Sequence, residues 1–543
     1  MTAEPGRGER FWWLPLIPAA TGVAASVVFD FAPVPAINDD WLYSWDVRHL
    51  LATHALKLFP DQEPLALFQV FWGALISLGR GDSALLRLST LPFLVLAAYA
   101  TWRLSRRMGA QKFWAAVTAA VVCTNPIVMY LATSFHTDVF YLGFAMAALW
   151  CSALWLEDGK ARTAFVALSA LATVERQVGA ALVLIGLLVL VLRRRRGSGT
   201  GKDLVACLAA GAAGAGILVL PFITGLATPM MAGGRVRHGI ESAVTAERAI
   251  LTFGPMLGLL ALPFLAAAMT ARLPRTGRPS IIAIALGAAG IGGALIQLLY
   301  PAAYSMFFGD VWAASTLGRE GMPGNKPPVY PPILFNAVSV LAVACFASLL
   351  IWRARMWTMR NLTLLGGVLV AFAMTQLAGA AATDRFDRYY IPIAIPLLPV
   401  IASSWSRAAT SRSARGWALL SVGVAVAAYV IGEQDLMNWQ AARDQLARDL
   451  YRTVSPLAVN AGYVPNALYA EIPYYERTGR LPPRNLAGNL VLPWAAVGPA
   501  QPRYIVCFAP PATAGGRMYR SLGAGSVISE PVSAIVYCTP YRS

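Results

Sequence analysis

The feature that most constrains this chain is the recurrence of apolar runs about 20 residues long. A helix needs about 20 apolar residues to cross the hydrocarbon core of a bilayer, and such runs recur along most of the sequence. Charged residues make up 13% of the 543 residues, against about 25% in soluble domains. A string of soluble domains is therefore excluded. Disorder is also excluded, because 57% of the residues are hydrophobic.

We predict an all-α polytopic membrane protein with about 13 transmembrane helices. The run 164–192 is too long for one span and carries Glu175-Arg176-Gln177 at its middle. It is expected to form two short helices, 164–174 and 178–192, that meet at this polar apex. The other predicted spans lie near 11–31, 84–104, 113–131, 139–156, 204–223, 249–270, 280–300, 332–352, 361–382, 389–405 and 416–433. The first run is too long for a secretory signal, so we expect it to remain as a span.

The formal net charge of +17 follows the predicted topology. Lys and Arg are favoured in short cytoplasmic loops. With a cytoplasmic N-terminus, the inside segments carry 22 Lys and Arg but only five acids, which accounts for the whole basic excess. No nucleic-acid partner is implied, and an odd number of spans places the C-terminus outside. The inside segments are 1–10, 103–112, 157–163, 193–203, 271–279, 353–360 and 406–415.

Two units follow from this topology. Residues 1–433 are expected to form the transmembrane module, with a long first extracytoplasmic loop at 32–83, and 434–543 a small extracytoplasmic α/β domain. The tail begins with an apolar stripe at helical spacing from Trp439 to Val454, and RYIVCFAP and SAIVYCTP are typical of strands. Cys507 and Cys538 lie on those strands. An oxidising compartment would let them form a disulfide, and the alternative is two free buried thiols.

An acidic segment, PAINDDWLYSWDVRHLLATHALKLF, follows the first span directly. Asn38 or Asp39 is suited to cap a helix. An amphipathic helix at the membrane interface is predicted by apolar residues at helical spacing, namely Leu51, Ala55, Leu58 and Phe59.

On that helix Asp39, Tyr43 and Asp46 share a face, and Asp40 points about 100° away. One carboxylate could then face a substrate while its neighbour orients a ligand or a metal. The alternative is a solvated helix start with two stabilising acids.

Asp138 stands in TSFHTDVFYLGF, in the short turn between two predicted spans, with His136 beside it. A lone Asp before an apolar run is often only a helix cap, so that alternative stays open. The apex Glu175-Arg176-Gln177 is different in kind. Broken helices and charged residues at membrane depth mark candidate functional sites, the alternative being an internal ion pair that satisfies the break.

A late segment, TDRFDRYYIPIAIPLLP, places Arg385 and Arg388 at the outer end of a span. An Arg at this position can hold a lipid phosphate through paired hydrogen bonds. Simple interfacial anchoring by Arg and Tyr is the alternative.

Taken in order, these segments resemble the GT-C membrane glycosyltransferases, most closely family 39, the protein O-mannosyltransferase and lipid A aminoarabinose transferase type. Members carry an Asp-Asp or Asp-Glu pair after the first span and then a Tyr, here Asp39-Asp40 and Tyr43. NDDWLYS, LLRLSTLPF and SFHTDVFY occur in the family's order, and Arg388-Tyr389-Tyr390-Ile391-Pro392 fits its RYY-x-P element. The resemblance covers about residues 10–435. Several members have Asp-Glu, so the shorter Asp40 departs from their pattern.

The resemblance implies a GT-C fold and transfer of a sugar from a polyprenyl-phosphate donor to a hydroxyl of a lipid, glycan or protein acceptor. The reaction would take place at the outer face of the bacterial cytoplasmic membrane and invert the anomeric centre, with Asp39 as general base and with Asp40 and Asp138 completing the acidic pocket. Substrate contacts are expected from Tyr43, His136, Glu175, Arg176, Gln177, Arg385, Arg388 and Tyr389. Family members differ in their need for a divalent metal ion; if one binds, Asp40 and Asp138 are the expected ligands.

Three other functions compete with this hypothesis. A lipid-linked sugar flippase or other transporter would be expected to show internal repeats and mid-span acids. The two halves of the sequence show no repeat, and its acids lie almost wholly in loops, at helix ends or in the tail. A cell-envelope polymerase or ligase of another GT-C branch would share the topology. A non-catalytic scaffold whose tail binds a partner would not need Asp39.

Overall fold

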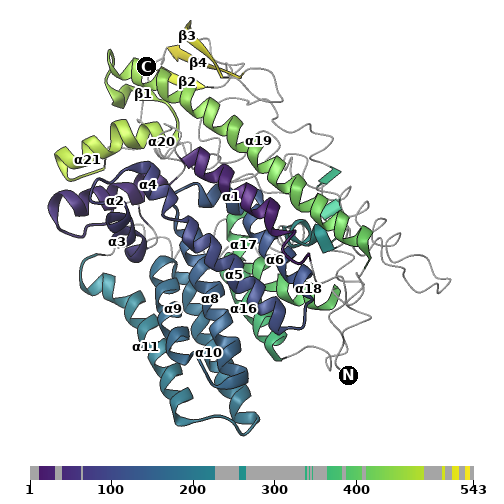
Figure 1. The fold of residues 1–543 in the computed structure, drawn as a ribbon. Helices are drawn as coiled ribbons and strands as arrows, with labels where there is room; N and C mark the ends of the chain where they lie inside the picture. Colours follow the sequence, from purple (N-terminus) through teal and green to yellow (C-terminus); the bar gives the residue numbers. More distant parts are fainter. Residues whose placement is uncertain are drawn as a thin grey trace.

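The computed structural model describes a largely helical chain (Figure 1). The described residues are 11–30, 39–60, 62, 65–226, 256–264, 337–338, 341–342, 345, 364–381, 387–405, 411–481, 504–507, 517–524 and 532–538. The predicted span 280–300 lies outside these residues, as do most of 249–270 and 332–352.

The N-terminal half of the described chain forms a series of helices, and from α3 onward most of them follow one another after only a few residues. These are α1 (Leu16–Asp30), α2 (Asp40–Thr53), α3 (Leu67–Ile76), α4 (Ser83–Leu88), α5 (Leu91–Arg107), α6 (Lys112–Thr124), α7 (Pro126–Ala132), α8 (Thr137–Asp158), α9 (Arg162–Glu175), a 3₁₀ turn (Gln177–Ala180), α10 (Ala181–Arg195) and α11 (Gly201–Ile223). The predicted break of the run 164–192 into two helices is confirmed, because α9 ends at Glu175 and α10 begins after the 3₁₀ turn.

Five described helices are long and apolar enough to cross a membrane, or six if the bent pair α6 and α7 is one span. The five are Ser83–Arg107, Thr137–Asp158, Gln177–Arg195, Gly201–Ile223 and Arg412–Tyr451. The bend of 58° between α6 and α7 falls at Asn125 and Pro126. Pro126 lacks the N–H that a continuous helix would need there.

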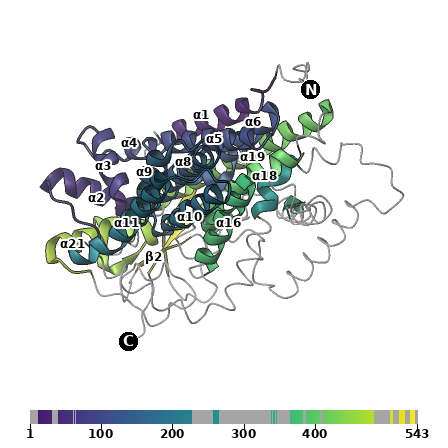
Figure 2. The ribbon, with the colours of Figure 1, turned by 90° about the horizontal axis from the view of Figure 1, so that it is seen from below.

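Helix α8 lies at the centre of the bundle and packs against α5, α9 and α10 (Figure 2). It is apolar nearly all round, as expected of a helix enclosed by others. Gly143 allows the close approach of α5, because a Cβ there would lie 2.8 Å from the carbonyl oxygen of Phe93. A larger residue at this position would push the two central helices apart.

Helix α2 begins where the sequence predicts, with Asp39 at the cap position. The predicted continuation of an amphipathic helix to Phe59 is wrong. The helix ends at Thr53, and His54 adopts a left-handed conformation with φ of 56°. Ala55 to Phe59 therefore lie outside it, held back against the helix because the Phe59 N–H donates to Asp46 Oδ1 over 2.9 Å. The first eight helical residues are all buried, so this part is enclosed by protein and is not an amphipathic face.

The C-terminal half contains one 40-residue helix, α19 (Arg412–Tyr451). At 1.5 Å per residue it is about 60 Å long, roughly twice the bilayer core. The predicted domain boundary at 433/434 falls inside this helix. No proline interrupts residues 412–451, so the helix can continue through the boundary. The other described helices here are α16 (Leu364–Ala381), a 3₁₀ turn (Asp387–Tyr390), α17 (Ile391–Ala394), a second 3₁₀ turn (Ile395–Leu397), α18 (Leu398–Trp405), α20 (Tyr463–Asn466) and α21 (Ile472–Thr478).

A four-stranded sheet lies near the C-terminal end of α19, in the order β1-β2-β4-β3 (Figure 1). Its strands are β1 (Val459–Asn460), β2 (Tyr504–Cys507), β3 (Arg517–Ala524) and β4 (Val532–Cys538). The two predicted strands are β2 and β4, and β1 and β3 were not predicted. β1 runs parallel to β2, and the other pairs are antiparallel.

The register of β2 and β4 does not support the predicted disulfide. Cys507 pairs with Ile535, and Cys538 pairs with Tyr504. Each cysteine thus lies three positions from the partner of the other, which is roughly 10 Å along the strands at about 3.4 Å per residue. A disulfide joins Cα atoms that are at most about 7 Å apart.

Candidate functional site

Four segments that are distant in sequence meet at one end of the bundle. They are the start of α2, the turn before α8, the break between α9 and α10, and the 3₁₀ turn at Asp387–Tyr390. Each contributes at least one charged side chain to a single cluster. In Figure 1 the short helices α2 to α4 mark this end, and the turn between α10 and α11 marks the other.

The cluster is a chain of alternating charges centred on His136. Its Nε2 lies 3.1 Å from Asp39 Oδ2, and its Nδ1 lies 2.5 Å from Asp138 Oδ2. Arg388 Nη1 approaches both His136 Nε2, at 3.1 Å, and Asp39 Oδ2, at 3.5 Å. Arg176 forms an ion pair with Asp138 Oδ1. The order along the chain of contacts is Arg176, Asp138, His136, Asp39 and Arg388.

The side chains of the cluster differ in their access to solvent. Asp138 is 4% exposed and His136 3%, whereas Asp39 is 20% exposed. Arg176 is 17% exposed and Arg388 6%. Asp39 is therefore the more accessible of the two carboxylates, and a hydroxyl arriving from outside the protein would meet it first.

The surroundings of His136 favour its charged form. Burial lowers the pKa of this imidazole, but Asp138 and Asp39 raise it by more, so the net pKa is above 6.5. As an imidazolium it has two N–H groups, one facing each carboxylate. The guanidinium of Arg388, 3.1 Å from Nε2, opposes this charge and lowers the pKa, but by less than the two carboxylates raise it. His136 thereby joins Asp39 to Asp138.

Asp138 does not cap a helix, so the simpler sequence alternative is wrong. It lies in the first turn of α8, the cap position is His136, and no side-chain cap hydrogen bond forms there. Its carboxylate instead contacts Arg176 and His136. The turn at Asp138 and the apex at Arg176, which the sequence presents as separate features, thus belong to one cluster.

Gln69 of α3 fixes the two turns that present the cluster, and sequence reasoning missed it. Its side-chain Nε2 donates to the carbonyl of Phe135 over 2.8 Å, and its backbone N–H donates to Glu175 Oε1 over 3.1 Å. Glu175 is completely buried and holds the start of α3. We assign it a positioning role in place of the predicted substrate contact. The only sequence signal for Gln69 is an amide within the apolar run LFQVFWGALI.

Tyr43 lies one helical turn after Asp39 and faces the same cluster. Its ring meets the His136 ring edge-on, with centroids 5.7 Å apart. Burial, together with the charge of Asp39, raises the pKa of Tyr43 well above 10, so the phenol stays neutral. The predicted common face therefore holds for Asp39 and Tyr43. It fails for Asp46, which is buried and accepts the Phe59 N–H.

Asp40 belongs to a second, deeper group that was not predicted. It is 2% exposed, and Asp30 and Glu433 are completely buried. The three carboxyls lie within electrostatic range of one another and of Arg87. Arg87, the arginine of LLRLST, also donates to the carbonyl of Asp30 over 3.1 Å.

Three predicted substrate contacts remain to be placed, namely Gln177, Arg385 and Tyr389. Gln177 is half-buried at the start of the 3₁₀ turn. Arg385 and the side chain of Tyr389 lie outside the described residues.

The predicted metal ligands do not fit a metal site. Among the described residues, no three His, Cys, Asp or Glu side chains converge on one position for an ion. Asp138 is held between Arg176 and His136, whose positive charges take the place that a cation would need. We derive no step through a metal.

Solved structures similar to this chain include two GT-C fold glycosyltransferases. ArnT from Cupriavidus metallidurans bound to undecaprenyl phosphate is 15% identical and matches over 96% of this chain and 97% of its own, with a TM-score of 0.41. The archaeal oligosaccharyltransferase AglB from Archaeoglobus fulgidus, in complex with an inhibitory peptide and a dolichol-phosphate, is 14% identical. That match covers 81% of this chain and 58% of AglB, with a TM-score of 0.43. No family model and no curated protein matches the chain.

Proposed function

We propose that this protein is a membrane glycosyltransferase that moves a sugar from a polyprenyl-phosphate donor to a hydroxyl group of an acceptor. One observation carries the proposal. A partly exposed carboxylate, Asp39, lies in a largely buried cluster with two guanidinium groups, at one end of a bundle of membrane-spanning helices. These side chains are linked by direct contacts. Asp39 can serve as a base, and the guanidinium groups can hold a phosphate.

The reaction that these groups support is an inverting displacement. The acceptor oxygen forms a bond to the anomeric carbon, and the bond from that carbon to the lipid phosphate breaks. The acceptor's proton passes to Asp39, and the electron pair of the broken bond leaves with the phosphate. General base catalysis requires a carboxylate within hydrogen-bond reach of that proton. Arg388, 3.5 Å from Asp39, favours the ionised form that can accept it.

The leaving lipid phosphate gains negative charge as the bond breaks, and fixed cations at that position lower the barrier. Arg388 lies beside Asp39, and Arg176 lies beside Asp138. We assign Arg388 to the donor phosphate because it contacts the proposed base directly. Arg176 orients Asp138, which in turn holds His136.

The orientation in the membrane is part of the proposal. The arginine run 193–196 forms the last turn and C-cap of α10, just before the turn to α11, at the end of the bundle opposite α2 and α21 (Figure 1). Positive loops favour the cytoplasmic side. The site would then face the outer side of the bacterial cytoplasmic membrane, with the N-terminus inside and the C-terminal sheet outside.

The test is turnover by the purified full chain with a panel of polyprenyl-phosphate sugars and a panel of hydroxyl acceptors. We expect free lipid phosphate and glycosylated acceptor to appear in equal amounts for at least one pair. Reconstitution into vesicles provides the comparison with a transporter. Movement of the intact donor across the bilayer, with no release of lipid phosphate from any pair, would contradict the proposal.

A further inference from the structure

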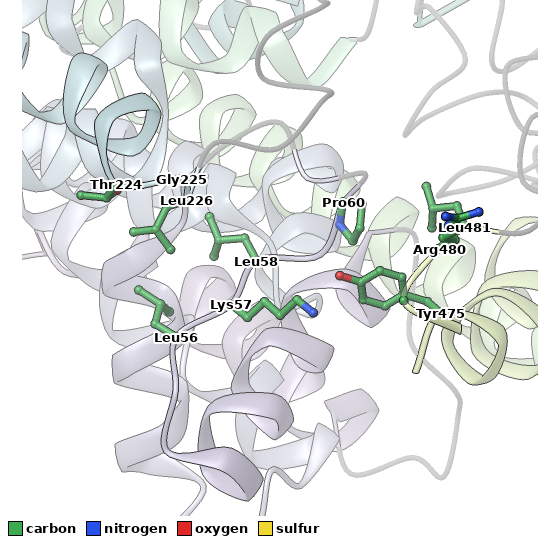
Figure 3. A pocket seen from close by; sticks show the side chains of 11 residues that line it. Leu56, Lys57, Leu58, Pro60, Thr224, Gly225, Leu226, Tyr475, Arg480 and Leu481 are labelled. Atoms are coloured by element: carbon green, nitrogen blue, oxygen red, sulfur yellow. The ribbon is translucent and has the colours of Figure 1, made fainter. Parts of the chain in front are cut away.

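A second binding site lies away from the charged cluster, where the segment after α2 meets α21 and the outer end of α11 (Figure 3). It is a pocket of about 650 Å³, within the size range of small-molecule sites. The residues of the cluster do not line it. Its lining residues are Leu56, Lys57, Leu58, Pro60, Thr224, Gly225, Leu226, Tyr475, Gly479, Arg480 and Leu481.

The pocket has an apolar side and a basic side. Figure 3 shows Leu56, Leu58 and Leu226 grouped toward the end of α11, and Tyr475 and Arg480 on the opposite side. Lys57 extends between them, with its Nζ 4.9 Å from the centre of the Tyr475 ring. None of the 11 lining residues is acidic. The lining therefore matches an amphiphile with a negatively charged head.

The apolar side continues onto a surface that faces lipid. The last turns of α11 expose large apolar side chains, with Leu220 at 56% and Ile223 at 76%. Thr224 and Leu226, which follow directly, line the pocket. An acyl chain in the outer half of the bilayer could thus enter beside α11 while its headgroup stays at the basic side.

We propose that this pocket binds an anionic glycerophospholipid of the surrounding membrane, with its phosphate at Lys57 and Arg480 and its acyl chain against the leucines. Lys and Arg side chains are attracted to anionic lipid headgroups. Two of them in one pocket therefore favour an anionic lipid over a zwitterionic one. The site goes beyond the proposed transfer reaction, which uses neither cation.

Binding here would also stabilise the helix that carries Asp39. The Tyr475 ring packs against Phe59, and Phe59 against Trp45 of α2, with centroids 5.2 Å apart in both pairs. Trp45 Nε1 also donates to Glu476 Oε1 over 3.0 Å. A lipid that joins Lys57 to Arg480 would clamp this contact between α2 and α21 from outside.

The test measures lipid binding by the full-length protein in a mild detergent. Short-chain phosphatidylglycerol is titrated below its micelle concentration, and short-chain phosphatidylcholine serves as the uncharged comparison. We expect Lys57→Ala/Arg480→Ala to weaken phosphatidylglycerol binding at least tenfold, and Lys57→Arg/Arg480→Lys to retain it. Arg477→Ala is the matched control, because Arg477 is an exposed cation on α21 outside the pocket lining; its binding should equal that of the wild type.

A second variant guards against misfolding of the double alanine protein. Thr224→Trp fills the pocket from the exposed end of α11 without a change of charge, and it should also abolish binding. Wild-type affinity in both the double alanine variant and Thr224→Trp would overturn the proposal. So would equal binding of phosphatidylcholine, or displacement of the lipid by inorganic phosphate at equal concentration, which would indicate a site for free anions.

Discussion

The two ends of the bundle each contain buried arginine–aspartate contacts, but they are built differently. At the end that is proposed to face the cytoplasm, called the inner end, Asp203 is completely buried and contacts Arg162 at 2.8 Å and Arg193 at 3.3 Å. It also accepts from Trp155 Nε1 at 2.6 Å and from the Thr200 N–H at 2.7 Å. All these partners come from residues 155–203. At the outer end the cluster draws on residues from 39 to 388 and leaves Asp39 20% exposed.

The comparison distinguishes a carboxylate with a structural role, Asp203, from one with a proposed catalytic role, Asp39. The inner carboxylate is enclosed by donors from neighbouring helices, so it caps α11 and ties it to α8 and α10. The outer carboxylate Asp39 has cationic neighbours and also remains open on one side. A buried ion pair is not by itself evidence of function, because ion-pair networks with a structural role are also found. Access to a substrate is what distinguishes the outer cluster, and the predictions below test that distinction.

The largest expected effect is on catalysis at the outer end. Asp39→Asn removes the proposed base while keeping the side-chain shape, and should lower kcat about 10²- to 10⁴-fold. Membrane insertion and the thermal unfolding midpoint should stay close to wild type. Asp82→Asn is the matched control, because Asp82 lies in the same loop but only caps α4. Wild-type turnover in Asp39→Asn would exclude Asp39 as the base.

The inner cluster should show the opposite result. Asp203→Ala leaves Arg193 buried without its carboxylate, and loss of one partner of a buried pair costs about 3–5 kcal/mol of unfolding free energy. Turnover per folded molecule should not change. Denaturant unfolding in detergent, read beside a single-turnover assay, measures both. A large loss of turnover with unchanged stability would show that the two ends do not differ as proposed.

A smaller effect is expected when the cationic side of the outer cluster is removed. Arg388→Ala should raise the donor KM about 10- to 100-fold, since a hydrogen bond to a charged group contributes about 1.5–3 kcal/mol. The acceptor KM should change little. Arg388→Lys keeps the charge and should recover part of the loss. Equal changes in both KM values would count against a phosphate contact.

The protonation of His136 should appear as a pH dependence of stability. Its pKa is raised in the folded protein, so the stabilisation is complete below pH 6.5 and is lost as pH rises through the folded pKa. One proton sets the upper limit of the slope at about 1.4 kcal/mol per pH unit. His136→Gln should remove this slope from unfolding curves recorded between pH 5.5 and 9. An unchanged slope in the variant would assign it to another group.

The smallest effect is expected at the exposed inner surface. Glu157 pairs with Arg107 on the surface, where their side chains are 37% and 23% exposed. Glu157→Gln should change the unfolding free energy by less than about 1 kcal/mol and leave turnover unchanged. A loss as large as that of Asp203→Ala would mean that burial does not account for the difference between the inner ion pairs.

Two predictions that depend on short stretches of sequence agree with the structure, namely the break of the run 164–192 and the start of α2. The break of the run 164–192 at Arg176 was predictable because a charged apex in an apolar run is costly without a turn. The start of α2 at Asp40 was predicted from Asp39 as a capping residue. Asp39 occupies the cap position, but its side chain forms no capping hydrogen bond and points to the charged cluster instead. The C-terminal end of α2 was missed, because the backbone contact from Phe59 to Asp46 competes with the apolar spacing that favours a longer helix.

The sequence alone determined that this is a helical chain for a membrane and that acids and arginines stand at the ends of its apolar runs, because hydropathy and helix breaks are local properties. Only the tertiary structure decided which of them meet. The contact of His136 with Asp39 spans 97 residues, and that of Arg388 with Asp39 spans 349. Such contacts depend on how helices pack around α8, and the same packing turns Asp40 away from its neighbour toward Asp30 and Glu433.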